Sequence, residues 1–239
     1  MNKRDNRWAR KLVLLMALAF AVTVGMTGAF AISGGAPAHA SGLDIGGATG
    51  LLTIPTADVA GTGRLVVGYH AVGPYYYNVY KNSIAVTAGL TNELELGVSS
   101  AFAYGDRETS FNAKYRFLPE SSHVPALAIG VDNSLTGRGT DFYLVLSKAI
   151  PELTTRFHAG VGNWGLFLGA SKVLNPVSVR GGRGSTLPET TLMAEWNAGL
   201  LNLGVRMQPI PHLLLDAGVI GLNTVPVTPV LGLEYAFQF

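Results

Sequence analysis

Cysteine is absent from the chain of 239 residues, and charged residues make up only 13% of it. The missing cysteine excludes a disulfide framework, a thiolate metal site and a lipid-modified N-terminal cysteine. The mean hydropathy of +0.31 is high for a soluble globular domain. Because the apolar residues are spread along the whole length, one apolar segment does not account for this value.

Long apolar runs are also missing beyond residue 40, where no stretch reaches the roughly 18 residues of a membrane helix. The N-terminus differs from the rest, with five basic residues in positions 1–11 and an apolar run from about Leu12 to Ile32. The small residues of Ala38-His39-Ala40 then form a cleavage site. This layout predicts a secretory signal peptide over residues 1–40, cleaved near Ala40. The alternative is a retained helical anchor.

The part of the chain that would be exported has no excess of basic residues. The whole chain has a formal charge of +2, but five of its 17 Lys and Arg residues belong to the signal peptide. The remainder is therefore slightly acidic. The pI of about 8.9 is no indication of nucleic-acid binding, and we exclude nucleic acid as a partner.

Alternation of apolar and polar residues recurs from residue 64 to the end of the chain. The alternating segments are separated by turns rich in Gly, Pro, Asn and Asp, which is the pattern of antiparallel strands. Residues 41–63 precede them as a periplasmic or plug-like lead-in. We predict about twelve strands, within a range of 10–14, at residues 64–72, 82–90, 93–103, 109–117, 125–132, 140–148, 154–162, 164–172, 189–197, 200–207, 212–220 and 229–239.

The two faces of these strands differ in chemistry. One face carries large apolar residues, and the other carries charged residues with Gly, Ser, Asn and Thr. A soluble β-sandwich also alternates, but a glycine-rich polar face fits the inside of a curved wall. Aromatic residues gather near strand ends, as in membrane barrels, and in lipid such strands must close. We predict an all-β, antiparallel transmembrane barrel over residues 64–239, in the outer membrane and surrounded by its lipid.

The last predicted strand alternates strictly and ends on Phe239 without a polar tail. Leu233, Tyr235, Phe237 and Phe239 share its apolar face. A final strand of this form looks like the signal that the outer-membrane barrel assembly machinery reads. We therefore expect this machinery to be a partner of the chain.

Several segments resemble the YjbH-like family of outer-membrane barrels, over most of residues 46–239. The first two look like the opening "G-x-x-G-L-x-x-x-P-T-A" segment of that family. The resemblance implies a barrel associated with exopolysaccharide production and export in Gram-negative bacteria, and it carries over no catalytic residues. The segments are 47–58 (GATGLLTIPTAD), 61–65 (GTGRL), 165–169 (GLFLG), 192–197 (LMAEWN), 202–206 (NLGVR) and the terminal strand.

Titratable residues on the polar face form a candidate lumen network. Six Lys or Arg and seven Asp or Glu nearly balance, unlike the single-sign rings of ion-selective pores. A salt-bridged network that stabilises a small barrel is favoured over a polar path for a glycan or solute. The residues are Arg64, His70, Glu93, Glu95, Lys114, Arg116, Asp132, Asp141, Lys148, Arg156, His158, Glu195, Arg206, Asp216 and Glu234.

No catalytic, metal or cofactor site is predicted from sequence motifs. No serine lies in a recognisable nucleophile motif, and no histidine pair has the spacing of metal ligands. By parity His70 and His158 point inward, where we expect them to form hydrogen bonds rather than act as bases of a lipid-modifying enzyme.

Four tyrosines follow the first predicted strand: Tyr75, Tyr76, Tyr77 and Tyr80. They are candidates for stacking on sugar rings, although such residues more often belong to the interfacial belt of a membrane protein. The leading hypothesis is a non-enzymatic outer-membrane barrel that assists export or assembly of an envelope polysaccharide. A small general-diffusion channel and an outer-membrane lipid-modifying enzyme are the alternatives.

Overall fold

The computed structural model describes residues 42–75, 79–103, 106–136, 139–174 and 188–239. The predicted signal peptide lies outside these residues, and so do the side chains of the four tyrosines. Among the described residues, no helix is long and apolar enough to cross a membrane.

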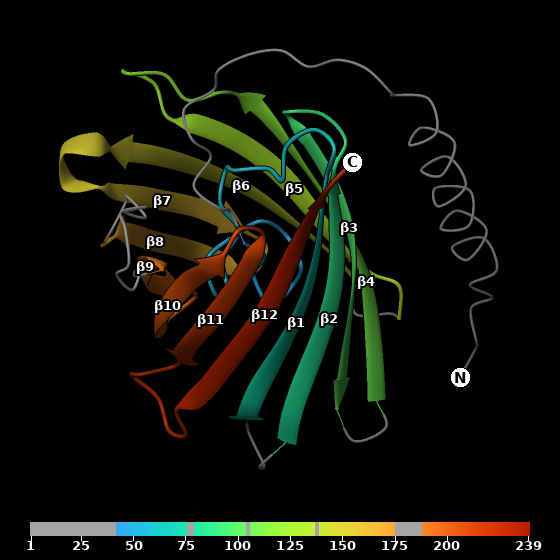
Figure 1. Ribbon diagram of the computed structural model, residues 1–239. Coiled ribbons are helices and arrows are strands. Elements are labelled where there is room, and N and C mark those ends of the chain that lie inside the picture. Colours follow the sequence, from blue (N-terminus) through green and yellow to red (C-terminus); the bar gives the residue numbers. More distant parts are fainter. Residues whose placement is uncertain (1–41, 76–78, 104–105, 137–138, 175–187) are drawn as a thin grey trace. The chain divides into compact units, whose positions relative to one another are not determined.

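In the described residues, twelve antiparallel strands form a closed barrel. Figure 1 shows how the strands follow one another around it. Each strand pairs with its neighbours in sequence, and β12 returns to pair with β1. The prediction of an all-β antiparallel barrel is confirmed. The strands are β1 (Arg64–Tyr75), β2 (Val79–Gly89), β3 (Leu94–Ala103), β4 (Asp106–Leu118), β5 (Ala126–Ser134), β6 (Gly139–Ile150), β7 (Thr155–Gly162), β8 (Gly165–Val173), β9 (Glu189–Asn197), β10 (Leu200–Ile210), β11 (Leu213–Ile220) and β12 (Thr228–Gln238), with one short 3-10 helix, η1 (Pro151–Leu153).

The seam between β1 and β12 closes the barrel over nine residue pairs, from Arg64–Gln238 to Val72–Val230. Closure matters because a strand edge left open in lipid would expose unpaired backbone groups. Because the number of strands is even, the start of β1 and the end of β12 lie at the same rim of the barrel. There Phe239 N donates to Gly63 O at 2.9 Å.

Several strands extend beyond their predicted ends. β4 begins at Asp106 rather than residue 109, and β6 runs to Ile150 rather than residue 148. At the first of these ends, pairing continues to Ala103–Asp106. Backbone hydrogen bonds between strands do not require apolar side chains. A strand can therefore continue beyond the last residue of the alternating pattern by which it is recognised in the sequence.

The outer surface of the barrel is apolar along its strands. Large side chains stand exposed at alternate positions, as with Phe142, Leu144 and Leu146 of β6 and Leu231, Leu233 and Tyr235 of β12. The exposed fraction reaches 63% at Leu231. A continuous apolar surface of this kind is rare on a soluble monomer and is typical of a barrel wall that faces lipid.

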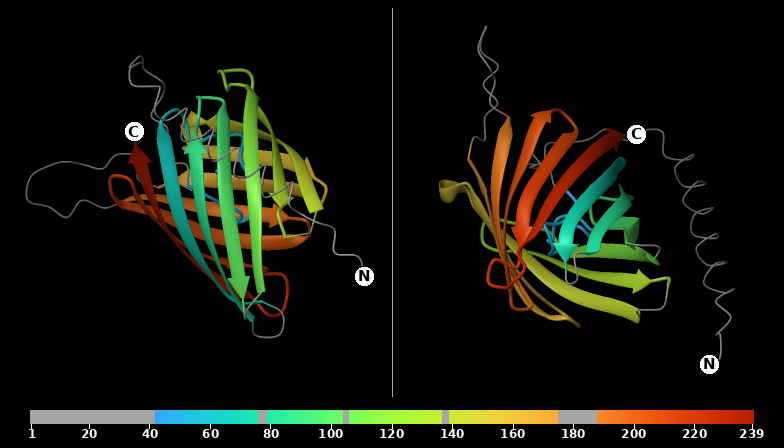
Figure 2. Two further views of the ribbon diagram at one scale, coloured as in Figure 1. Left: turned by 90° about the vertical axis from the view of Figure 1, so that its right-hand side faces the viewer. Right: turned by 90° about the horizontal axis from the view of Figure 1, so that it is seen from below.

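The segment before β1 lies inside the barrel, where Figure 2 shows it enclosed by the strands. We call residues 43–60 the plug. The plug turns back on itself through isolated bridges between Leu43 and Thr49 and between Gly50 and Pro55. Its Leu52 and Ile54 are buried in the main apolar cluster, together with wall residues of β5, β6, β8 and β9.

Glycines on the inner wall make room for the plug. A Cβ at Gly169 would lie 2.6 Å from Ile54 Cδ1, and one at Gly204 or Gly218 would lie 2.6 Å from Leu52 Cδ1. Real side chains do not approach so closely, so any larger residue at these positions would force the side chain of Leu52 or Ile54 to move. The plug therefore accounts for these three glycines, whereas other inward glycines lie against side chains of the wall itself.

Candidate functional site

The candidate site is the polar interface between the plug and the barrel wall. Inward side chains stand directly opposite each other across hairpins, and in several of these pairs one member bonds to the plug. These pairs include Glu95–Lys114, Ser147–His158, Glu195–Asn202 and Arg206–Asp216.

Glu95 of β3 and Lys114 of β4 bind the plug at Thr49. Their side chains are almost completely buried, and Lys114 Nζ lies 3.0 Å from Glu95 Oε1. The carboxylate accepts from Thr49 N at 3.0 Å and Ala60 N at 2.7 Å, and Lys114 donates to Thr49 O at 2.7 Å. The pair is thus neutralised within the wall, while its remaining hydrogen-bonding capacity is used by the plug.

Glu195 of β9 binds the next part of the plug without a cation among the described residues. Its carboxylate accepts from Leu52 N, from Thr53 N at 3.1 Å and from Thr53 Oγ1 at 2.7 Å. Asn202 of β10 donates to the same carboxylate at 3.2 Å. A buried charge with neutral partners only is expensive, so the plug donors are needed to keep this carboxylate solvated.

Arg206 of β10 holds the carbonyl groups of the plug. Its Nη1 donates to Gly50 O at 2.9 Å and its Nη2 to Leu43 O at 3.1 Å. Its Nε and Nη2 form a bidentate pair with Asp216, both at 2.8 Å. Glu234 of β12 completes the contact by accepting from Leu43 N at 2.8 Å.

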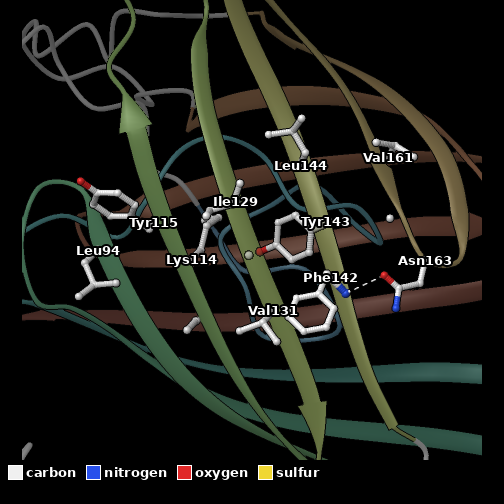
Figure 3. A pocket seen from close by; sticks show the side chains of 13 residues that line it. Leu94, Lys114, Tyr115, Ile129, Val131, Phe142, Tyr143, Leu144, Val161 and Asn163 are labelled. Carbon is white, nitrogen blue, oxygen red and sulfur yellow. Dashed lines mark hydrogen bonds between the residues drawn. The ribbon is translucent and has the colours of Figure 1, made fainter.

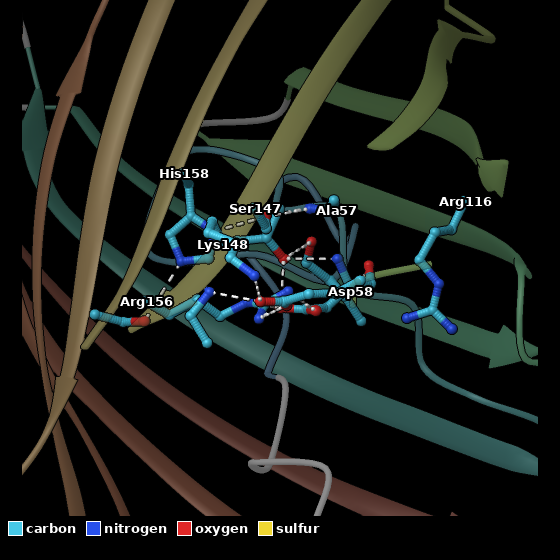
Figure 4. Close-up of polar contacts among 12 residues, drawn as sticks. Ala57, Asp58, Arg116, Ser147, Lys148, Arg156 and His158 are labelled. Atoms are coloured by element: carbon cyan, nitrogen blue, oxygen red, sulfur yellow. Dashed lines mark hydrogen bonds and ion pairs between the residues drawn. The ribbon is translucent and has the colours of Figure 1, made fainter. Parts of the chain in front are cut away.

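The end of the plug lies against β6 and β7, as Figure 4 shows. Arg156 forms a bidentate pair with Asp58, at 2.8 and 3.2 Å, and also contacts Glu120 in the turn after β4. Ser147 Oγ accepts from Ala57 N at 2.9 Å and lies 2.8 Å from His158 Nδ1. A Ser–His pair is the arrangement of a nucleophile and its base, but here the plug covers the serine.

Three carboxyl groups outside the strands have shifted pKa values. Burial raises the pKa of Asp44 from 3.8 to about 7, against the opposing attraction of Lys114. For Asp58 burial acts in the same direction, but the charge of Arg156 outweighs it and the pKa is lowered. The pKa of Glu120 is also lowered, because the Ala149 N–H and Arg156 outweigh its partial burial.

The structure divides the predicted lumen residues into two groups. Arg156 binds the plug from a partly exposed position, Arg64, Arg116 and Asp132 are half-buried, and Asp141 is exposed. The fully buried ones face the plug or its contacts directly: His70, Glu95, Lys114, His158, Glu195, Arg206, Asp216 and Glu234.

Two residues of the predicted network do not face the lumen. Glu93 is exposed in the turn before β3, where it contacts Thr91. Lys148 shares the parity of the exposed Leu146, and its Nζ donates to Ser121 O at the rim. Asp141 and Lys148 are an odd number of positions apart, so a regular strand cannot place both on one face.

The predicted assembly signal lies on the outer face of β12 and at the chain end. Leu233, Tyr235, Phe237 and Phe239 are all exposed, and the rings of Tyr235 and Phe237 meet edge to face with centroids 4.7 Å apart. These positions leave the aromatic rings free to contact lipid or a protein partner.

The sequence reading missed the plug's half of the interface and some of its partners on the wall. The missed residues include Asp44, Thr49, Thr53, Asp58, Ser83, Ser147 and Asn202. A signal existed for three of them, because Thr49, Thr53 and Asp58 lie within the family-like segment at 47–58.

A groove of about 650 Å³ crosses the wall from β3 to β7 (Figure 3). Outward apolar side chains line most of it, including Tyr115, Ile129 and Phe142. Asn163 lies at one edge of the groove, where its Oδ1 accepts a hydrogen bond from Phe142 N at 3.0 Å. Most of its lining belongs to the lipid-facing surface, and the inward residues Lys114 and Tyr143 also border it.

Comparisons with known proteins give one family match and several similar solved structures. The YjbH family model, described as "Exopolysaccharide biosynthesis protein YbjH", matches residues 44–193. The chain is similar to the outer membrane protein Omp33 of Acinetobacter baumannii, at 10% identity and a TM-score of 0.47, over 74% of this chain and 100% of that one. It is similar to Ail, the attachment invasion locus protein of Yersinia pestis, at 16% identity and a TM-score of 0.19, over 73% and 99%. No curated protein matches the chain.

Proposed function

This chain belongs to the YjbH family of exopolysaccharide biosynthesis proteins, and from that premise we propose that it is a non-enzymatic outer-membrane barrel assisting export or assembly of an envelope polysaccharide. The observation that carries the proposal is the extent of the family match. The match begins at residue 44, inside the plug, and continues into β9. The lumen-filling segment therefore belongs to the family pattern, together with most of the wall.

Outer-membrane location is supported by the apolar outer surface of a closed barrel. In lipid this surface needs no further cover, whereas in water it would be a severe aggregation hazard. The terminal strand, with its exposed Tyr235, Phe237 and Phe239, fits recognition by the barrel assembly machinery. Export to that compartment through a signal peptide is part of the same proposal.

A passive structural role agrees with the surroundings of the Ser147–His158 pair. Both residues are buried, and Ser147 Oγ already accepts the Ala57 N–H of the plug. A lipid-modifying enzyme needs its nucleophile at the lipid-facing rim, within reach of an acyl chain. The inward direction of Ser147 is the opposite of that arrangement.

The plug also argues against an unrestricted diffusion channel. It occupies the lumen with Leu43 and Ile54, both 0% exposed. If the plug moved, the wall would offer polar groups along the lumen, and Lys114 and Arg206 would keep their carboxylate partners Glu95 and Asp216. A polar lumen that keeps its internal ion pairs is suited to a neutral or weakly charged glycan.

A deletion strain tests the proposal. In a Gram-negative host that carries the gene, we expect deletion to lower surface polysaccharide several-fold and to leave intracellular precursor at or above its normal level. Complementation with the wild-type gene should restore the surface polymer. A matched complementation with Ile129→Ala, which changes only the lipid-facing surface, should restore it equally.

Unchanged surface polysaccharide in the deletion strain would remove the main support for this function. Planar-bilayer recording separates the channel alternative. The wild-type barrel should conduct poorly, while a variant with residues 43–60 replaced by a Gly-Ser linker should conduct. High conductance of the wild type would favour the general channel.

A further inference from the structure

Three buried side chains converge where the barrel closes. His70 lies on β1, Asp216 on β11 and Glu234 on β12, three strands that run side by side in Figure 1. Their exposed fractions are 1%, 4% and 1%. One ring nitrogen of His70 and one oxygen of each carboxylate lie within 4.8 Å of one another.

A glycine allows this convergence. Gly232 stands opposite His70 on one side and opposite Asp216 on the other. A Cβ there would lie 2.7 Å from His70 Cδ2 and 2.9 Å from Asp216 Cβ. The absence of a side chain at this position thus keeps open the space into which the three groups point.

The distances from His70 to the two carboxylates are slightly longer than a hydrogen bond. His70 Nε2 lies 3.6 Å from Glu234 Oε1 and 3.9 Å from Asp216 Oδ2. Among the described residues, the buried Glu234 Oε1 has no hydrogen-bond partner and lies 3.6 Å from Arg206 Nη2. Ligands bound to one metal ion by bonds of about 2.0–2.2 Å stand roughly 3–4 Å apart, which matches these separations.

The charges around the cluster leave a negative excess. Asp216 and Glu234 both face Arg206, whose Nε lies 2.8 Å from Asp216 Oδ1 and whose Nη2 lies 3.6 Å from Glu234 Oε1. Two carboxylates therefore share one guanidinium group at ion-pair distance. Arg206 uses one lone pair on each oxygen of Asp216, and each oxygen retains another. Asp216 is able to accept a cation on Oδ2 without losing its arginine.

We propose that His70, Asp216 and Glu234 bind a divalent transition-metal ion, with Zn²⁺ as the reference ion. One imidazole and two carboxylates form a donor set that zinc accepts. The ion joins β1 to β12 across the closure seam. Through Glu234, whose Oε2 accepts from Leu43 N at 2.8 Å, it also fixes the start of the plug. This inference goes beyond the proposed function and does not depend on it.

Zinc content measured by mass spectrometry tests the site. The folded barrel in detergent is incubated with Zn²⁺ at pH 8 and then desalted. Exposed His123 and His212 are first replaced by alanine, to remove surface binding. We expect about one zinc per chain in this background, and at least a tenfold loss in His70→Ala and in Glu234→Gln. His158→Ala is the matched control, because it removes another buried histidine and should keep the zinc.

The same background protein, with His70, Asp216 and Glu234 intact, provides a second measurement that no folding defect of a cluster variant affects. Co²⁺ should give visible absorption bands of a nitrogen- and oxygen-ligated ion, and Zn²⁺ should raise the thermal midpoint while EDTA reverses the rise. Less than a tenth of a zinc per chain in the background protein would overturn the proposal. A protonated His70 would then supply the positive charge beside the two carboxylates. Equal zinc in His70→Ala would overturn it as well.

Discussion

The two sides of the plug contact the barrel in different ways. Towards β3, β4 and β9 to β12, the plug's backbone groups bond to buried charges such as Glu95, Glu195 and Arg206. Towards β5, β6 and β8, Leu51, Leu52 and Ile54 pack in an apolar cluster that contains Tyr143 and Phe167. Buried charges contribute little net stability when paired but are costly when unpaired, whereas apolar burial is favourable throughout. The polar side therefore fixes the position of the plug, and the apolar side supplies its stabilisation.

Loss of one charge on the polar side should have the largest effect. Lys114→Met leaves the fully buried Glu95 without its cation, so we expect a loss of about 3–5 kcal/mol in the free energy of unfolding. Urea titration followed by tryptophan fluorescence measures it. The double variant with Glu95→Gln should recover most of the loss. A single-variant loss below about 1 kcal/mol would contradict the assignment of Glu95 as a charged group dependent on Lys114.

On the apolar side, truncation of one plug residue should cost slightly less. Ile54→Ala removes a completely buried side chain from the cluster, and we expect a loss of about 2–5 kcal/mol in the same titration. The matched control is Ile129→Ala on the outer wall, where the side chain is 49% exposed. Similar losses in the two variants would show that the plug is not packed as described.

The polar side should also respond to pH through Asp44. Its pKa rises from 3.8 to about 7 on folding, so between these values the folded chain holds a proton that the unfolded chain has released. Stability should therefore fall as the pH rises from 5 to 7, with a slope of at most about 1.4 kcal/mol per unit, and level off above. Asp44→Asn should abolish this component, as unfolding at a series of pH values would show. An unchanged profile in the variant would assign the dependence to another group.

Removal of a charge at the rim should have a small effect. Glu120 and Arg156 have side chains that are 22% and 20% exposed, and Arg156 keeps Asp58 as a partner. We expect Glu120→Gln to change the free energy of unfolding by about 0–1 kcal/mol. A loss as large as that of Lys114→Met would mean that the contrast between rim and lumen is wrong.

The smallest effect on stability is expected at the outer end of β12. Phe239→Ala removes a side chain that is 54% exposed and keeps the backbone bond to Gly63. The unfolding titration should hardly change. In cells, by contrast, we expect several-fold less heat-modifiable barrel in the outer-membrane fraction, with export across the inner membrane retained. Normal insertion of the variant would end the role of Phe239 as an assembly signal.

The alternation of side chains made the wall predictable. Residues such as Leu231, Leu233 and Tyr235 read as one face in the sequence and stand exposed on the outer face of the barrel. The error at Lys148 was avoidable, because its parity is that of Leu144 and Leu146. Parity does not explain the error at Glu93, because Glu93 and Glu95 have the same parity. Glu93 instead lies just before β3, which begins at Leu94.

The plug contacts had no comparable signal. Thr49 and Glu95 are 46 positions apart, and Leu43 and Glu234 are 191 apart. The plug has no periodic strand or helix, so its sequence does not indicate which backbone groups point at which strand. Even the convergence of His70, Asp216 and Glu234 depends on the return of β12 to β1, a long-range contact that no local pattern specifies.

The sequence alone determined a closed antiparallel wall with an apolar outside and a polar inside, because strand periodicity and the chemistry of lipid are local constraints. Only the tertiary structure decided that residues 43–60 fill the lumen and that the wall's charges bind the plug backbone rather than water. The physical reason is that a buried charge is acceptable only where particular partners reach it. In this barrel those partners arrive from a segment distant in sequence.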